Sequence, residues 1–403
     1  MKKNWLTLNS ETFLWLKGEE GLLYNTLNAT SFHFVNTGEV KKIGNELLKA
    51  DNLYSVMVSD NQLQDKKTVA WIDSIITNNM GCLTREVTYE ERPISLMPIL
   101  KVQDNTQRYV WEHNRGIQGT ILDNLHEVFF YINGTANGEN ELYKQIIYPL
   151  KINESLDYRD IIDFCYNSKN PFLTRIYLIG SLFTYPSYSI LLNELHQLHI
   201  QLVITVTDID YLHYMQAYTD LTMQEDTIVQ VMVKNINRME ELLVNHNKIN
   251  VCYYFLVASE AEYEYVLDTI ERDNKKLDYQ IIPIVKDNLD FFRNLVYLDK
   301  KELTEIPLTK RDIFVRQSIN LNDFGRLTVL SDGRVYSNIN HPSLGAIKNL
   351  PIDLVYKEFT KGQSWFNVRK QKPCSDCIYQ WLCPSLSNIE LAIGKPNLCL
   401  IKE

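Results

Sequence analysis

Four cysteines near the end of the chain are the residues most clearly spaced for chemistry. They follow the pattern Cys374-x2-Cys377-x5-Cys383-x15-Cys399. A Cys-x2-Cys pair on a tight turn places two sulfur atoms a few ångströms apart, and two later cysteines can complete a tetrahedron from a second loop. The spacing therefore predicts a four-thiolate metal site.

The spacing also bears on which metal such a site would bind. Zinc modules usually contribute two Cys-x2-Cys pairs, whereas this group contains one. A [4Fe-4S] cluster tolerates uneven ligand spacing, and the step Cys383-Pro384 is typical of iron-sulfur loops, where proline stiffens the turn. The pattern favours one [4Fe-4S] cluster. Zn²⁺ and four reduced, packed cysteines are the alternatives.

Composition limits the class of protein. A chain of 403 residues, 45% hydrophobic and 23% charged, is long enough for two or three globular domains. The net charge of −9 without a dense basic patch argues against nucleic acid as a partner. No run of 18 apolar residues could span a membrane, and no apolar stretch follows the first two lysines. We therefore expect a cytoplasmic protein without a membrane partner.

The remaining cysteines, Cys82, Cys165 and Cys252, are isolated in apolar settings. We expect each to be a small buried hydrophobic residue. The odd total of seven also argues against a disulfide framework.

Residues 1–100 predict a small domain of strands and helices. The stretch GLLYNTLNATSFHFVNTG indicates two strands joined by a polar turn at 28–30. Apolar residues at helical spacing predict one helix after Thr37, a candidate N-cap, and a second over KKTVAWIDSIITNN. A sheet with helices at this size resembles a winged helix, and prolines near 91–106 indicate a linker.

Residues 107–305 alternate between strand-like and helix-like runs. Spacing of about 25 residues is typical of parallel βαβ units, because parallel neighbours need a crossover connection. Six such units predict a partial (β/α)6 barrel in an α/β protein. The strand-like runs cover residues 127–133, 175–180, 201–206, 227–233, 250–257 and 278–285.

Residues 306–403 lose this regularity. RLTVLSDGRVYSN predicts a hairpin with its turn at Asp332-Gly333, since Asp-Gly supplies the positive φ of a tight turn. A helix-like segment over 352–370 leads into the cysteines. We expect this part to be a separate metal-binding domain.

The barrel and the cysteine-containing tail together resemble radical S-adenosylmethionine enzymes that carry a SPASM domain and mature ribosomally made peptides. In that family the tail binds two auxiliary clusters, and the four C-terminal cysteines match the ligands of the second. Ligands of the first are missing, because Asn338 and Ser387 stand where the family has cysteines. The resemblance thus implies one auxiliary cluster in a SPASM-like domain.

The barrel departs from the family at its active site. The family's three cluster cysteines would fall near Thr135, Glu139 and Leu142, where no cysteine is present. Of the family's Gly-Gly-Glu element only Gly180 remains. The chain therefore resembles the pseudo-radical-SAM proteins of Bacteroidales systems whose precursors have a double-glycine leader. That resemblance implies a non-catalytic protein that binds no S-adenosylmethionine.

The resemblance also implies a role for residues 1–100. Peptide maturases of this kind often carry a winged-helix-like element that binds the leader peptide as an added strand. By analogy the candidate groove residues are Phe32, Phe34, Trp71 and Ile75. The alternative is that these side chains form the core of a small domain.

The function implied is that of a partner in peptide maturation, which binds the precursor leader and an active radical S-adenosylmethionine maturase as a heterodimer. The cluster would be structural, with an electron-relay role also open. Two other functions are compatible with the sequence. One is an enzyme with a rebuilt barrel active site, and the other is a zinc-stabilised adaptor outside peptide maturation.

Other polar residues give weaker patterns. His213 lies near Asp208 and Asp210, which suggests either a metal site at a strand end or, as we expect, a solvated loop. Glu139 and Glu141 are expected in an exposed loop. His113 and His126 have no suitably spaced catalytic partner.

Overall fold

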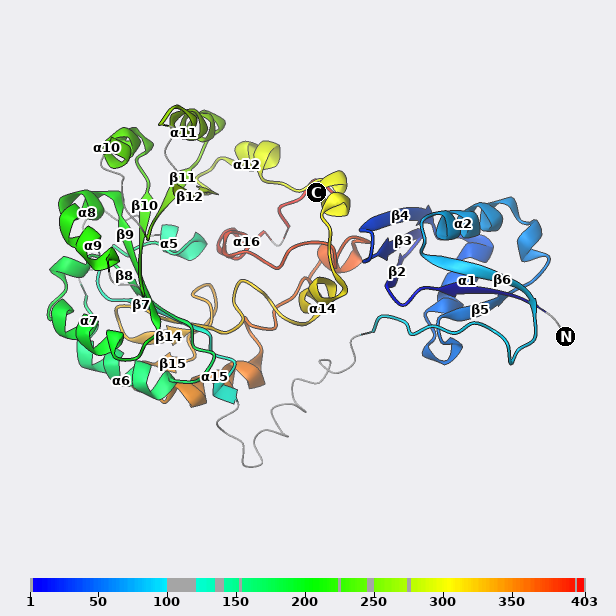
Figure 1. Cartoon of the computed structure of the whole chain (residues 1–403), viewed down its shortest axis with the longest axis horizontal. Helices are drawn as coiled ribbons and strands as arrows, with labels where there is room; N and C mark the ends of the chain where they lie inside the picture. The colour runs from blue at the N-terminus through cyan, green and yellow to red at the C-terminus, as the bar shows by residue number, and fades with distance from the viewer. Residues whose placement is uncertain are drawn as a thin grey trace.

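The computed structural model describes residues 3–99, 121–134, 141–151, 154–223, 226–244, 250–273, 277–395 and 397–401. The molecule is elongated, with the N-terminal part at one end, a large curved sheet at the other and the C-terminal loops between them (Figure 1).

The N-terminal part contains two antiparallel three-stranded sheets, ordered β5-β1-β6 and β2-β3-β4. Ala29 adopts a positive φ of 53° in the predicted turn between β3 and β4. Thr37 is the N-cap of α1, and Asp65 caps α2 by accepting a hydrogen bond from the Thr68 backbone N–H. The elements are β1 (Lys3–Leu8), β2 (Thr12–Lys17), β3 (Glu20–Asn25), β4 (Thr30–Val35), α1 (Gly38–Leu47), β5 (Ser55–Val58), α2 (Lys66–Thr77) and β6 (Gly81–Val87).

The large sheet has nine strands in the order β12-β11-β10-β9-β8-β7-β13-β14-β15. All six predicted strands of the middle segment are present and pair in parallel, which confirms an α/β protein with a large parallel sheet. The strands are β7 (Glu127–Tyr131), β8 (Arg175–Ile179), β9 (Gln201–Thr207), β10 (Thr227–Val233), β11 (Val251–Val257), β12 (Asp278–Pro283), β13 (Arg326–Val329), β14 (Arg334–Tyr336) and β15 (Gly345–Ala346).

The predicted C-terminal hairpin is not separate from this sheet. It forms β13 and β14, with Gly333 at a φ of 80° in the turn, and β13 pairs in parallel with β7. Arg326 of β13 lies opposite Glu127 of β7, and its Nε donates to the Glu127 carboxylate at 2.7 Å. The C-terminal segment therefore extends the central sheet by three strands.

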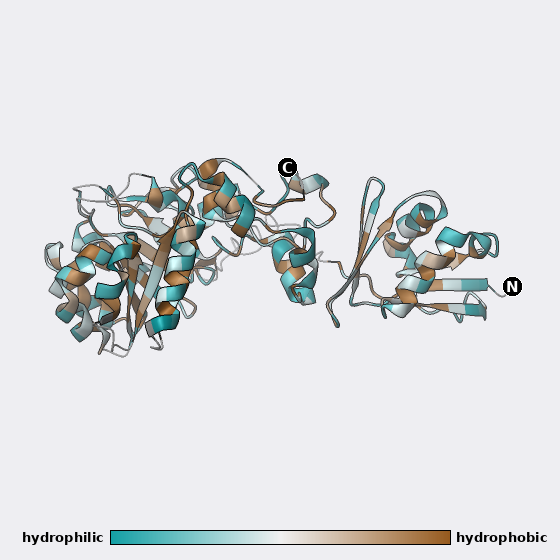
Figure 2. Ribbon diagram, turned by 90° about the horizontal axis from the view of Figure 1, so that it is seen from above, coloured by the Kyte–Doolittle hydropathy of each residue, from teal (hydrophilic) through white to brown (hydrophobic). Residues whose placement is uncertain are grey.

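Helices cover both faces of the curved sheet. Its outer side carries α6 to α11, whereas the short helices α5 and α16 lie on the inner side (Figure 1). Apolar residues concentrate along the strands, and polar residues face outward on the helices (Figure 2). The helices are α5 (Leu142–Gln145), α6 (Tyr158–Ser168), α7 (Tyr188–His196), α8 (Asp208–His213), α9 (Met215–Thr222), α10 (Met239–Val244), α11 (Glu260–Asp273), α12 (Leu289–Leu295), α13 (Lys300–Glu305), α14 (Lys310–Ser318), α15 (Pro351–Lys361) and α16 (Asn388–Ile393).

The sheet β2-β3-β4 packs on both of its faces. Leu14, Leu23 and Phe34 belong to the core beneath α1 and α2. On the opposite face, Phe13 and Leu22 join a second core that is formed with the C-terminal part of the chain. That core contains Tyr24, Leu303, Leu308, Ile313, Cys377, Ile378, Tyr379 and Leu382. One small sheet thus links the N-terminal part to the cysteine loops.

Replacing Tyr24 by phenylalanine is expected to loosen this contact by about 1–3 kcal/mol. The Tyr24 hydroxyl accepts a hydrogen bond from the buried Leu308 N–H at 2.7 Å, which would lose its acceptor. Hydrogen exchange should accelerate at α13 and α14. Tyr54→Phe is the control, because the Tyr54 hydroxyl donates to the Thr12 carbonyl within the N-terminal part. Equal exchange at α13 and α14 in Tyr24→Phe and the wild type would contradict this prediction.

Candidate metal and peptide sites

The cysteine loops are positioned by short backbone turns. Cys374 begins a 3-10 turn that ends at Asp376, and the Cys377 N–H donates to the Cys374 carbonyl at 3.1 Å. The Cys383 N–H donates to the Tyr379 carbonyl at 3.2 Å. Cys399 forms an isolated parallel bridge with Leu298, which fixes the tail of the chain beside α13.

These turns bring the four thiols close enough to act on one another electrostatically. The pKa of Cys383 is raised to about 12, and burial is the largest cause. Arg369 opposes this rise, whereas the cysteines at 374, 377 and 399 add to it. Burial likewise raises the pKa of Cys374, and the Arg369 charge opposes that rise. The Cys374 sulfur accepts a hydrogen bond from Arg369 Nη1 at 3.9 Å. Two of the four thiols, Cys374 and Cys383, thus interact with the same cation, Arg369.

The thiols do not form a preassembled metal site. Within the described parts of the chain, no group of three or more His, Cys, Asp or Glu side chains is arranged so that it could bind a metal ion. The donor set has the soft-ligand chemistry of an iron-sulfur or zinc site, and no disulfide pairs Cys374, Cys377, Cys383 or Cys399. Their role as metal ligands stays a prediction.

Arg369 organises the loops around the cysteines. Its guanidinium forms a bidentate ion pair with Glu390, at 2.9 Å and 3.1 Å, and both side chains are buried. Its Nε donates to the Pro384 carbonyl at 2.6 Å. Glu390 in turn accepts from the Ser387 N–H, so that the segment after Cys383 is anchored to α16. The position at which the family has a cysteine, Ser387, therefore caps a helix here.

Arg369→Met is expected to destabilise the C-terminal part by about 3–5 kcal/mol, because it leaves the Glu390 carboxylate buried without its cation. Denaturant unfolding monitored by tryptophan fluorescence measures this loss. Lys301→Met, in an exposed pair with Glu305, is the control and should leave the unfolding midpoint unchanged. Equal midpoints for the two variants would contradict the prediction.

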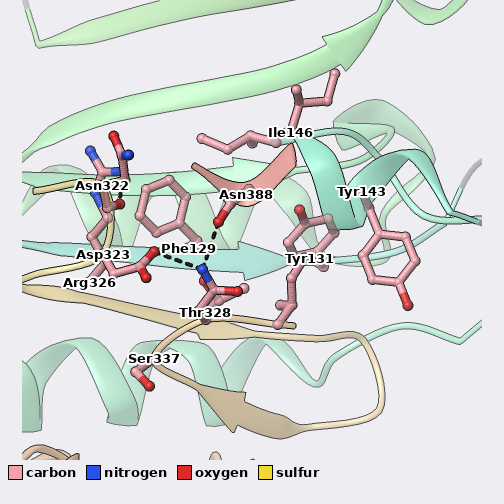
Figure 3. A pocket seen from close by; sticks show the side chains of 13 residues that line it. Phe129, Tyr131, Tyr143, Ile146, Asn322, Asp323, Arg326, Thr328, Ser337 and Asn388 are labelled. Carbon is pink, nitrogen blue, oxygen red and sulfur yellow. Dashed lines mark hydrogen bonds between the residues drawn. The ribbon is translucent and has the colours of Figure 1, made fainter. Parts of the chain in front are cut away.

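Asn338, the other position at which the family has a cysteine, belongs to a buried polar network. Its Nδ2 donates to Asp323 at 2.8 Å and to Asn388 at 2.6 Å, as Figure 3 shows. The second Asp323 oxygen accepts from Asn320 and Ser364. The adjoining cavity of about 50 Å³ has room for a few water molecules at most. The polar side chains of this region are therefore hydrogen-bonded to one another.

The buried carboxyl group of Asp323 is expected to make a pH-dependent contribution to the free energy of unfolding. Burial raises its pKa to about 6, against roughly 3.9 in an unfolded chain. The folded state therefore binds the proton more tightly, so the stabilisation is present below pH 4 and is lost as pH rises through 6. Between pH 4 and pH 7 the free energy of unfolding should fall by about 3 kcal/mol more in the wild type than in Asp323→Asn. Parallel pH profiles for the two proteins would contradict this.

Side chains pack closely at the carboxyl end of β8. Gly180 follows β8, and a Cβ there would lie 2.2 Å from the Asn133 amide oxygen, so glycine is required. Beside it, Asp210 accepts hydrogen bonds from the hydroxyls of Ser181 and Tyr218. Leu142, one of the three positions compared with cluster cysteines, is buried at the start of α5.

The structure corrects two expectations about polar residues and cysteines. Asp208 and Asp210 do not lie in a solvated loop, because they begin α8 and are largely buried. Cys165 and Cys252 are buried as expected, but Cys82 is exposed on β6. Glu141 is exposed as expected and pairs with Lys144 at 2.6 Å. The positions Thr135, Glu139 and His113 lie outside the described residues.

A groove of about 640 Å³ runs between the edge strand β4 and helix α2. Among the described residues, β4 pairs with β3 alone in its sheet, so its other edge is available for hydrogen bonding. Phe32, Phe34 and Trp71 line the groove, whereas Ile75 is fully buried beneath α2 and does not line it. Val35, 68% exposed, borders the open side. The arrangement provides both a strand edge and an apolar floor.

Two structural likenesses illustrate what the comparisons with known proteins find. One is to the crystal structure of Streptococcus suis SuiB bound to precursor peptide SuiA, with 12% identity, a TM-score of 0.46 and coverage of 99% of each chain. The other is to SuiB bound to S-adenosylmethionine, with 11% identity, a TM-score of 0.45 and coverage of 98% of this chain and 99% of that one.

No family model matches the sequence, and no curated protein matches it. In the described parts of the chain, every helix is too short or too polar to cross a bilayer.

Proposed function

We propose that this chain is a non-catalytic partner in the maturation of ribosomally made peptides. The observation that carries the proposal is the groove between β4 and α2, which combines an available strand edge with an aromatic floor. Main-chain hydrogen bonds along such an edge give affinity for an extended peptide, and pockets beside it give side-chain specificity. The peptide would be the leader of a precursor in a double-glycine-leader system of the Bacteroidales type.

The proposal divides the chain into three functional parts. The winged-helix-like residues 1–100 bind the leader, the degenerate barrel at 107–305 contacts an active radical S-adenosylmethionine maturase, and the SPASM-like residues 306–403 bind one [4Fe-4S] cluster. The four C-terminal cysteines would ligate that cluster, which would stabilise the tail. Cys377 and Cys383 pack in the core beside the sheet β2-β3-β4, which supports a structural role for a metal bound there.

We infer from the sequence of the barrel that this chain does not cleave S-adenosylmethionine. The stretch after β7 has no cysteine, and Gly180 is followed by Ser181, whose hydroxyl donates to Asp210. The Ser181 hydroxyl thus bonds to the Asp210 carboxylate at this strand end. We infer that the maturase partner, and not this chain, cleaves S-adenosylmethionine.

Co-expression with the neighbouring maturase and precursor tests the proposal. Precursor modification should require this chain, and the two proteins should co-purify as a heterodimer. The isolated chain, reconstituted without oxygen, should bind one cluster and generate no 5′-deoxyadenosine. Cleavage of S-adenosylmethionine by the isolated chain would refute the non-catalytic role and favour an enzyme with a rebuilt active site.

A further inference from the structure

The groove between β4 and α2 also opens onto the start of helix α1. Residues 37–40, which are the N-cap and the first turn of α1, line it together with Lys67 and Trp71 of α2. The first N–H groups of an α-helix have no intrahelical partner, and the side chain of the N-cap Thr37 forms no hydrogen bond with them. A Cβ atom built on Gly38 would have no neighbour within 4 Å, so a ligand has room to approach this first turn. The helix start therefore offers hydrogen-bond donors and the positive end of its dipole to the groove.

Trp71 gives an independent indication that a ligand of the groove supplies an acceptor. Trp71 lines the groove, is 3% exposed, and packs against Phe34 with ring centroids 5.4 Å apart. Its Nε1–H group has no hydrogen-bond acceptor among the described residues. Buried indole N–H groups usually have an acceptor, because a buried donor without a partner costs free energy. An acceptor on a bound peptide would remove that cost.

The charged side chains of the groove favour the same kind of ligand. Both carboxylate oxygens of Glu39 already accept from side chains of the N-terminal part, one from Lys42 at 2.6 Å and the other from Gln62 at 2.9 Å. Asp65 caps α2. Lys67 is exposed, and no ion pair among the described residues includes it. The acids of the groove are thus engaged within the chain, whereas its donors are available.

We propose that this groove selects a leader segment that carries an acidic side chain among apolar ones. The apolar side chains cover Phe32 and Phe34. The acidic carboxylate accepts from the first N–H groups of α1, with Lys67 supplying the opposite charge, and Trp71 Nε1 donates to the same segment. This inference rests on the proposed function and specifies the chemistry of the leader that the groove binds.

Amide-substituted leader peptides test this inference. The full chain is titrated against a labelled synthetic leader from the neighbouring precursor gene, with fluorescence anisotropy as the measurement. A series of peptides in which each aspartate or glutamate is replaced singly by asparagine or glutamine is measured in the same way. One of these replacements should weaken binding about tenfold or more, because the amide keeps the shape of the side chain but loses its charge.

Lys67→Met identifies the protein side of this contact. It should weaken binding of the unsubstituted leader by roughly two- to fivefold, as expected for a solvent-exposed charge pair. It should have no further effect on the peptide that has lost the essential acid, because the interaction is then already absent. Lys66→Met is the matched control, since Lys66 is an exposed neighbour that does not line the groove. It should bind both peptides as the wild type does.

Two results would overturn this inference and leave the proposed function intact. One is leader binding that Phe32→Ser weakens but that no amide replacement changes. The other is a Lys67→Met variant in which the unsubstituted and the amide-substituted leader are affected equally. Failure of the leader to bind the folded wild-type chain would refute the proposed function, and this inference with it.

Discussion

Cys383→Ser is expected to yield a protein that purifies without metal and has a less stable C-terminal part. Cys383 interacts electrostatically with Cys374, Cys377 and Cys399, so its loss removes one of the four proposed ligands. Binding of a metal to four thiolates contributes roughly 10 kcal/mol or more to folding. Iron, sulfide and zinc contents per chain after anaerobic purification, together with thermal unfolding, measure the effect.

Cys82→Ser is the matched control for this experiment. Cys82 is an exposed cysteine on β6, and its replacement should leave metal content and unfolding temperature unchanged. Wild-type metal content in Cys383→Ser would exclude the four-cysteine site. Stoichiometric zinc without sulfide in the wild type would instead identify the zinc alternative.

Phe32→Ser is expected to weaken leader-peptide binding by a factor of about ten to a hundred, or about 1.4–2.8 kcal/mol. Phe32 lies on the edge strand β4, stacks on Phe34 with ring centroids 5.8 Å apart and lines the groove. A serine there would remove apolar surface that the peptide is expected to cover. Fluorescence anisotropy with a labelled synthetic leader from the neighbouring precursor gene measures the affinity.

Leu27→Ser provides the control, because Leu27 is 77% exposed in the β3–β4 turn and does not line the groove. It should bind the leader with wild-type affinity. Circular dichroism establishes that both variants are folded. If Phe32→Ser binds as tightly as Leu27→Ser, the peptide does not use this groove.

The sequence predicted the parallel strands because each is a local apolar run buried in the sheet. It did not predict the pairing of β13 with β7, since the two segments are separated by almost 200 positions and no local pattern records which distant strand is the neighbour. The hairpin turn at Asp332-Gly333 was predictable, because its requirement for positive φ is local. Its place in the central sheet was not.

The same distinction applies to the sites. The resemblance suggested a groove by analogy, and Phe32, Phe34 and Trp71 do line one, but Ile75 lies in the core beneath α2. The run of polar residues around Asp208 suggested a loop. In the structure the Thr207 hydroxyl accepts from the Asp210 N–H and starts a helix, which carries Asp208 into the interior. In the sequence, the indication that a helix starts here was the strand that ends immediately before it.

Both faces of the small sheet β2-β3-β4 pack against other parts of the chain. A peptide strand added at β4 would restrain the twist of this sheet. On the opposite face of the sheet, Phe13, Leu22 and Tyr24 pack against the loop that contains Cys377. If peptide binding changes the affinity of the cysteine loops for metal by some factor, thermodynamic reciprocity requires that metal binding change the affinity for peptide by the same factor.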